Sequence, residues 1–171
     1  MVLTGKWTVG EPLRGGGGQG RTTGAVFNLN AGSAAASTFW STGYRRLNAV
    51  NRIIDAANLI EDSAEKNDIL GQAYALRAFA HFQLLSYYST DYADDNALAV
   101  IKLDFVPSIA DKLLRNTNGE IYASIESDLT AATRLLAEQS NPIFVSKDFV
   151  LALRARMAAY RGQYTMAETY A

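Results

Sequence analysis

The sequence predicts an all-α fold in which antiparallel helical hairpins follow a long irregular N-terminal segment. From Thr38 onward, apolar residues recur at alternating spacings of three and four, which is the periodicity of one helix face. Capping signals and turn residues divide this region into separate helices. The 171 residues are 49% hydrophobic and 19% charged, a composition typical of a globular domain. We therefore expect an irregular segment at 1–37 and a helical domain at 38–171.

Glycine and small polar residues are frequent in the segment 1–37. Their spacing imitates the phosphate-binding pattern G-x-G-x-x-G at Gly15, Gly17 and Gly20. Such a loop works when a buried strand precedes it and a helix follows it, and the flanking residues favour neither. We therefore expect a loop without a nucleotide site, and a short strand near residues 25–29.

The first two helices are predicted to form the centre of the core. One face of the first carries large side chains and amides at helical spacing: Trp40, Tyr44, Leu47, Asn51, Ile54 and Asn58. The capping-box spacing of Asp62 and Glu65 starts a second helix, which should end at about Tyr88. Because this second helix is apolar on several sides, other helices should enclose it. We expect Leu76 and Phe82 in its buried centre.

A long connection at 89–116 leads to the third helix. It contains a short apolar run at 98–105, ended by Pro107, which predicts an extended segment. Thr117 and Glu120 then form the capping box of the third helix.

The remaining helices are expected in the last thirty residues or so of the chain. Ser146 is the predicted N-cap of a fourth helix, and Gly162 suits the left-handed position that closes it. A fifth helix, at 164–171, reaches the last residue without a cap. We therefore expect the helical domain to be truncated at its C-terminus.

A short internal repeat supports the hairpin arrangement. The tetrapeptide Ala-Leu-Arg-Ala occurs at 75–78 and again at 152–155, each time on the second helix of a predicted pair. Residues 160–167 add a tight glycine turn between aromatic residues. Together these features indicate divergent helical repeats of the tetratricopeptide type.

Composition excludes several classes of function. A formal net charge of −1 provides no basic excess for nucleic acid phosphates. The absence of cysteine excludes disulfides, thiolate metal sites and cysteine nucleophiles. No apolar run approaches the roughly 20 residues of a membrane-spanning helix, and residues 1–10 lack the layout of a secretory signal. Either the protein is cytosolic, or its true start is missing.

Few polar residues are placed for chemistry. His81, the only histidine, stands between apolar neighbours, which predicts a packed side chain rather than a zinc ligand or a triad base. We expect no catalytic residue, no metal and no cofactor. Arg77 and Arg154 should form buried or half-buried hydrogen bonds to carbonyls or carboxylates. The pair Glu126 and Asp128 is interpreted as solvated.

Several blocks of residues, in order, resemble the SusD/RagB family. The first is the spacing of Trp40, Tyr44, Leu47 and Asn51. The second is Gly-Gln-Ala-x-x-Leu-Arg-Ala-x-x-x-Phe-x-Leu at 71–84, followed by two tyrosines. The third block, Arg-x-Thr-x-x-Glu-x-Tyr-x-x-Ile-x-x-Asp-Leu-x-x-Ala, lies at 115–132, and the fourth at 146–167. Gln72 and Ser89 replace the family's usual Glu and Gly, and the lipid-bearing N-terminal cysteine is absent.

The resemblance covers about 38–171 and implies a surface lipoprotein of Bacteroidetes-type bacteria. Such a protein captures oligosaccharides, or peptides in some members, as the partner of a SusC-like TonB-dependent transporter, and it is not an enzyme. It would meet the outer membrane only through a lipid anchor that this chain lacks. Because aromatic rings stack on sugars and loops often hold ligands, we expect ligand contacts at Trp7, Phe27 and Phe39. The alternative is a cytosolic tetratricopeptide-type scaffold that holds a peptide.

Overall fold

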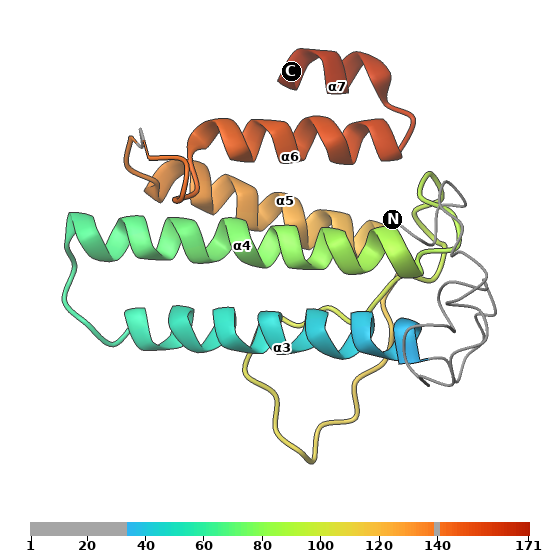
Figure 1. Cartoon of the computed structure of the whole chain (residues 1–171), viewed down its shortest axis with the longest axis horizontal. Helices are drawn as coiled ribbons and strands as arrows, with labels where there is room; N and C mark the ends of the chain where they lie inside the picture. Colours follow the sequence, from blue (N-terminus) through green and yellow to red (C-terminus); the bar gives the residue numbers. More distant parts are fainter. Residues whose placement is uncertain (1–33, 139–140) are drawn as a thin grey trace, which may run out of the picture. The chain divides into compact units, whose positions relative to one another are not determined.

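The computed structural model describes residues 34–138 and 141–171, and these contain helices and no strand beyond one isolated bridge (Figure 1). The prediction of an all-α fold is confirmed. The helices are α3 (Ala34–Ala57), α4 (Ala64–Tyr88), α5 (Asn118–Leu135), α6 (Lys147–Tyr160) and α7 (Tyr164–Tyr170). The glycine-rich stretch and the strand expected near 25–29 lie outside the described residues. Because α3 begins at Ala34, the last positions of the segment predicted to be irregular are helical.

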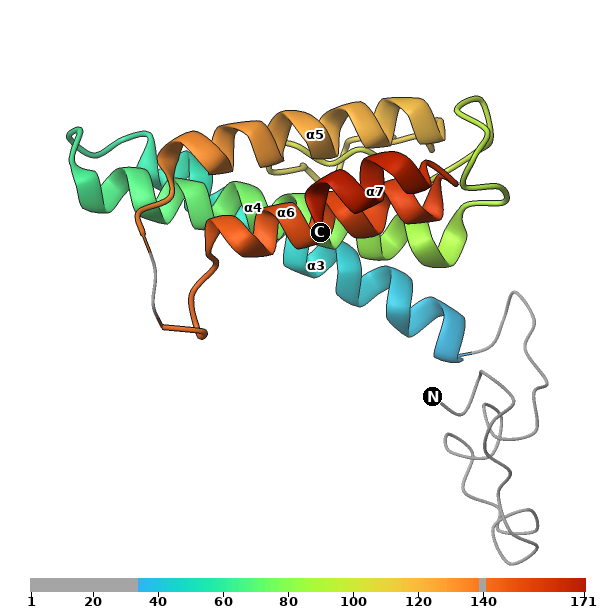
Figure 2. The same ribbon diagram turned by 90° about the horizontal axis from the view of Figure 1, so that it is seen from above.

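The chain divides into two compact units, residues 1–42 and 43–171. In the first unit, the described residues are the opening turns of α3. In the second unit, each helix runs antiparallel to the one before it, from the rest of α3 through to α7 (Figures 1 and 2). This order is that of successive helical hairpins.

α4 is the central helix of the second unit and packs against α5 and α6. Its other side meets Val50, Ile54 and Ala57 of α3. Phe82 is fully buried, as predicted. Small residues let the neighbours approach closely: a Cβ atom on Gly71 would lie 2.8 Å from the backbone nitrogen of Leu136, at the end of α5.

The prediction for Leu76 is wrong, because 43% of this residue is exposed. Leu76 shares an exposed flank of α4 with Ile69 and Tyr87. The helix is apolar on more sides than its neighbours cover, so periodicity alone did not show which flank faces solvent.

Side-chain caps fix the starts of three helices. The N-cap of α4 is Ser63, whose hydroxyl accepts from the backbone of Lys66, while Asp62 pairs with the Lys66 ammonium instead of capping. The other predictions hold: Thr117 and its capping box start α5, and Ser146 starts α6. Gly162, with φ of 71°, occupies the left-handed position after α6.

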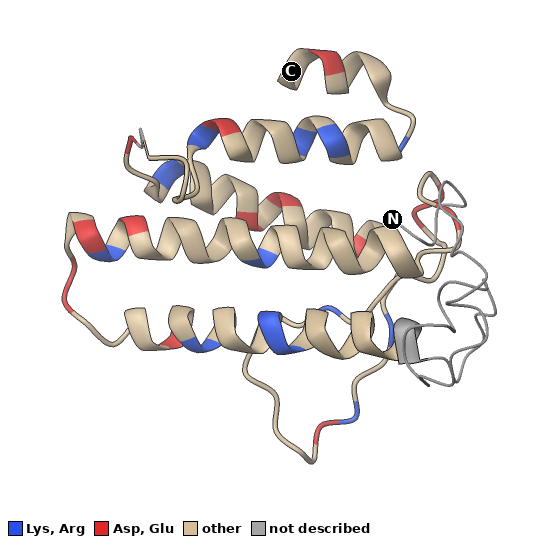
Figure 3. Ribbon diagram, viewed as in Figure 1, with Lys and Arg blue, Asp and Glu red and all other residues tan. Residues whose placement is uncertain are grey.

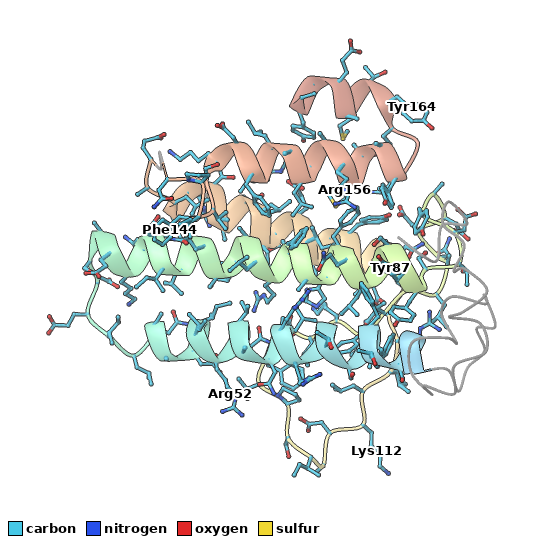
Figure 4. All side chains as sticks on the ribbon, in the orientation of Figure 1. Arg52, Tyr87, Lys112, Phe144, Arg156 and Tyr164 are labelled. Atoms are coloured by element: carbon cyan, nitrogen blue, oxygen red, sulfur yellow. The ribbon has the colours of Figure 1, made fainter. Side chains whose placement is uncertain are left out.

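Residues 97–105, called the crossing segment below, contain no helix and run back along α3 and α4 (Figure 1). Leu98 forms an isolated antiparallel bridge to Thr117, so backbone pairing of the kind expected for an extended segment is seen at the start of the predicted run. Beyond the crossing segment, a loop that includes Lys112 projects past α3 (Figures 1 and 4). Basic and acidic positions are interspersed along the described helices (Figure 3).

Candidate functional site

A buried ion pair joins α4 to α5. Arg77 Nε donates to Asp128 Oδ2 at 2.9 Å, and Arg77 Nη2 donates to Asp128 Oδ1 at 2.7 Å. Only 10% of the Arg77 side chain and 6% of the Asp128 side chain are exposed. Arg77 Nη1 also donates to Asn51 Oδ1 and to the carbonyl of Asp104, at 3.0 Å and 3.2 Å. The predicted bonding of Arg77 is confirmed, whereas the interpretation of Asp128 as solvated is wrong.

Asp128 is buried because Arg77 supplies both a positive charge and two aligned N–H donors. Burial raises the pKa of the Asp128 carboxyl above its ordinary value, and the neighbouring guanidinium limits the rise. A bidentate pair of this kind neutralises both buried charges, and its two parallel hydrogen bonds fix the position of α4 relative to α5.

The same network holds the crossing segment. His81 Nε2 accepts from the backbone nitrogen of Leu103 at 3.1 Å, which assigns the ring proton to Nδ1. Burial, with the Arg77 charge, lowers the pKa of His81 to about 4, so the ring is neutral at pH 7. Asn51 Nδ2 donates to the carbonyls of Leu103 and Phe105 at 3.0 Å and 2.7 Å. The packed role predicted for His81 is confirmed.

A polar hollow of about 440 Å³ borders this network. Its lining groups bond mainly to one another: Lys102 pairs with Asp104 at 3.1 Å, and Asn116 donates to Glu120 at 3.1 Å. No aromatic side chain lines the hollow. Because these charged and amide groups already bond to one another, we interpret the hollow as part of the structural network that joins α4, α5 and the crossing segment.

A second hollow, called the arginine cleft below, lies between α5, α6 and α7 and has a volume of about 400 Å³. Arg154 of α6 and Arg161, which directly follows the end of α6, both line it and are seven residues apart in the sequence. Arg154 Nη2 pairs with Glu126 Oε1 at 2.6 Å and also donates to Thr130 Oγ1 at 3.1 Å. Arg161 Nη2 pairs with Asp95 Oδ1 at 2.6 Å. The carboxylate partner predicted for Arg154 is confirmed.

Aromatic rings complete the arginine cleft. The Arg161 guanidinium stands 4.4 Å from the centre of the Tyr122 ring, and the Arg154 guanidinium stands 6.0 Å from that of Tyr170. Burial raises the pKa of Tyr122 to about 12, and its hydroxyl donates to the carbonyl of Tyr92 at 3.2 Å. The buried Tyr122 ring is therefore held in place on one side of the cleft by its hydrogen bond. Tyr170, by contrast, is only half-buried.

Arg156, between these two arginines, has a different role. It points from α6 toward α4 (Figure 4), where its guanidinium lies 5.6 Å from the ring centre of Phe82. It therefore supports the packing of α6 on α4 and does not line the arginine cleft.

Of the three ligand contacts predicted from the sequence, the structure describes one. Trp7 and Phe27 lie outside the described residues. Phe39 belongs to α3 rather than to a loop, because the helix starts five residues before it, and 42% of it is exposed.

Sequence reasoning missed most of the arginine cleft. Asp95 belongs to the long connection at 89–116, for which no ion pair was predicted, and Arg161 belongs to the glycine turn at 160–167. The one available signal was the spacing of Arg154 from Arg161, seven residues apart near the predicted end of the fourth helix.

The described residues show neither a metal site nor a membrane-spanning helix. In 34–138 and 141–171, no cluster of acidic or histidine side chains is arranged to hold a metal ion. Among these same residues, no helix is both long enough and apolar enough to cross a membrane.

The chain is similar to known proteins along most of its length. A SusD-like family model, described as "Starch-binding associating with outer membrane", matches residues 23–160. SusD-like protein P2 of Formosa agariphila is 27% identical over 146 residues, which are 82% of this chain and 27% of that protein.

Solved structures share the fold. A SusD-like carbohydrate binding protein from Bacteroides vulgatus superposes with a TM-score of 0.76 at 27% identity, over 87% of this chain and 33% of that one. A SusD superfamily protein from Bacteroides thetaiotaomicron gives a TM-score of 0.71 at 23% identity, over 77% and 30%. The chain thus spans about a third or less of the length of these relatives. Its matched region nevertheless contains the first three blocks of the resemblance and most of the fourth, and the chain belongs to the SusD-like family that this model describes.

Proposed function

We propose that the protein captures oligosaccharides at the cell surface for import through a SusC-like TonB-dependent transporter. The observation that carries this proposal is the family match over residues 23–160, on a fold shared with a SusD-like carbohydrate binding protein. We also propose that the protein is held at the outer membrane by a lipid anchor.

The proposed role is binding without catalysis. The single histidine, His81, is fully buried and its Nε2 already accepts a backbone hydrogen bond, so it is not available as a general base. Sugar capture needs no reactive group. It needs rings that cover the C–H faces of a sugar and polar side chains that bond its hydroxyls.

Trp7, Phe27 and Phe39 remain our proposed contacts to the glycan. Phe39 is the one of the three that the structure describes, and its exposed ring on α3 is accessible for such a contact. Phe144 offers a matched control, because 47% of it is exposed but it lies in the connection between α5 and α6.

Native affinity electrophoresis tests glycan capture. The product of the complete reading frame should migrate more slowly in gels that contain at least one polysaccharide from a panel of starch, laminarin, xylan and galactomannan. Phe39→Ala should reduce this retardation more than Phe144→Ala. Unchanged migration in every gel would argue against glycan capture.

Purification from the outer membrane tests the transporter partnership. The tagged complete product, solubilised in mild detergent from its native membrane, should co-purify with a TonB-dependent receptor identified by mass spectrometry. Recovery of the tagged protein from the soluble fraction, without any such receptor, would instead favour a cytosolic scaffold.

A further inference from the structure

We propose that an apolar seam between α3 and α4 is an interface inside the complete protein, on which a helix from the rest of the polypeptide packs. The seam is formed by Ile53 of α3 with Ile69 and Leu76 of α4. Such an interface is a property of the fold and is present whether or not the protein binds a glycan.

The register of the two helices brings the seam residues to one side of the hairpin. Arg46 Nη1 of α3 donates to Gln83 Oε1 of α4 at 3.3 Å, which shows which turns of the two antiparallel helices are adjacent (Figure 1). Ile53 follows Arg46 by seven residues. On the other helix, Leu76 precedes Gln83 by seven residues, and Ile69 precedes it by fourteen. Because residues seven apart share a helix face, these side chains border the same groove.

The seam is exposed and uncharged. Ile53, Ile69 and Leu76 are 46%, 41% and 43% exposed. The positions between them on the same faces are small or neutral: Ala49, Ala56 and Gln72. A helix surface that faces water normally carries charged side chains, and contiguous exposed apolar surface marks an interaction site. A neutral aliphatic strip along two adjacent helices therefore indicates a surface that is covered in the complete protein.

The spacing of the seam indicates that the covering element is a helix. Apolar side chains seven residues apart on two antiparallel helices form the walls of a groove like those between the helices of a bundle. The stretch of α4 from Ile69 to Gln83 is about 21 Å long, the length of a helix of about four turns. Since Ala49 and Ala56 have small side chains, such a helix can approach α3 closely.

The length of the relatives indicates that the covering helix belongs to the same polypeptide. This chain covers 27% of SusD-like protein P2 and 33% of the SusD-like carbohydrate binding protein from Bacteroides vulgatus. A complete protein of similar length contains at least as many further residues, which need a surface to pack on. Permanent interfaces are strongly apolar, whereas the surfaces that meet transient partners are about as polar as the rest of a protein surface. The seam is of the permanent kind.

Cysteine labelling compares the seam in the 171-residue chain and in the product of the complete reading frame. The chain contains no cysteine, so Ile53→Cys or Leu76→Cys introduces a single thiol into it. A maleimide should modify either position at least about tenfold more slowly in the complete product, because a covered side chain reacts only when the structure opens locally. Leu114→Cys is the matched control, since Leu114 is 85% exposed in the loop beyond the crossing segment and should react equally fast in both. Mass spectrometry of the digested protein identifies the labelled position.

Leu76→Asp gives a second measurement that does not depend on access of the reagent. It should lower the thermal midpoint of the complete product by several degrees more than that of the 171-residue chain, because only the complete product buries the new charge. Equal labelling rates and equal shifts in the two proteins would overturn the proposal. It would also be overturned by protection that appears in the 171-residue chain at high concentration, which would identify a second copy as the occupant. Protection of the complete product that disappears when a co-purifying protein is removed would identify a separate partner instead.

Discussion

Replacing Asp128 by alanine should strongly destabilise the fold, because it leaves the Arg77 guanidinium buried without its counter-charge. The Arg77 side chain is only 10% exposed, and two of its hydrogen bonds end on Asp128. Removing one partner of a buried pair typically costs about 3–5 kcal/mol. Since small domains have about 5–15 kcal/mol of stability in total, Asp128→Ala should bring the protein close to unfolding.

A double-mutant cycle separates the pair from other effects of substitution. Arg77→Met should also cost about 3–5 kcal/mol, because it leaves the Asp128 charge buried. The variant that carries both Arg77→Met and Asp128→Ala contains neither charge. Its loss should fall short of the sum of the single losses by about 2–3 kcal/mol.

Urea unfolding followed by circular dichroism at 222 nm measures these free energies. Lys102→Ala is the control, because Lys102 and Asp104 form an ion pair in which each side chain is 40% exposed. Such a half-exposed pair should contribute less than about 1 kcal/mol. The reasoning would be refuted if Asp128→Ala cost no more than Lys102→Ala, or if the double variant lost the full sum.

Three further predictions concern pH, helix contact and capping. Burial lowers the pKa of His81 from 6.5 to about 4, so the unfolded chain binds a proton more readily than the folded chain does. The free energy of unfolding should therefore fall by about 3 kcal/mol as the pH decreases from 6.5 to 4. In His81→Gln, the urea midpoint should not show this dependence on pH. Gly71→Ala places a Cβ atom 2.8 Å from the Leu136 nitrogen and should cost about 1–3 kcal/mol in urea unfolding, although alanine favours helix. Thr117→Ala removes the hydroxyl of a capping box and should lower thermal stability by about 1 kcal/mol.

Each of these predictions has a result that would contradict it. Parallel pH profiles for the wild type and His81→Gln would show that the histidine does not govern acid sensitivity. A more stable Gly71→Ala would mean that α4 and the end of α5 are not in close contact. For the cap, Thr133→Ala is the control, because this exposed threonine donates only to the Leu129 carbonyl within the same helix. If Thr117→Ala and Thr133→Ala lowered thermal stability equally, the capping hydrogen bond of Thr117 would not be what stabilises α5.

Local patterns in the sequence were sufficient to predict the helices. Apolar periodicity located the helical region, and the caps at Thr117 and Ser146 marked two helix starts correctly. These signals are local, because a cap bonds within its own first turn. The prediction that Asp62 caps α4 was wrong by one residue, because two adjacent residues can both act as caps. Ser63 is the N-cap, and the Asp62 carboxylate instead pairs with Lys66.

Contacts between distant residues were harder to predict. The burial of Arg77 was predictable from its apolar neighbours, but its partner Asp128 lies 51 positions away on a helix that also carries exposed acids. The spacing of Asp128 from Ile121 and Ile125 places it on the buried face of α5, unlike Glu126, which is 43% exposed, but this spacing does not identify Arg77 as its partner. The arginine cleft was missed for the same reason, because Asp95 meets Arg161 across 66 positions.

The crossing segment has a consequence for shortening the protein. Tyr44, Asn51, Arg77 and His81 bond to its backbone at Ile101, Leu103, Asp104 and Phe105. A version of the chain that ended before residue 97 would keep α3 and all of α4 but would leave these side chains without their hydrogen-bond partners in an apolar interface. The first hairpin is therefore not an autonomous folding unit, and its two helices become stable only when the later part of the polypeptide returns to lie over them.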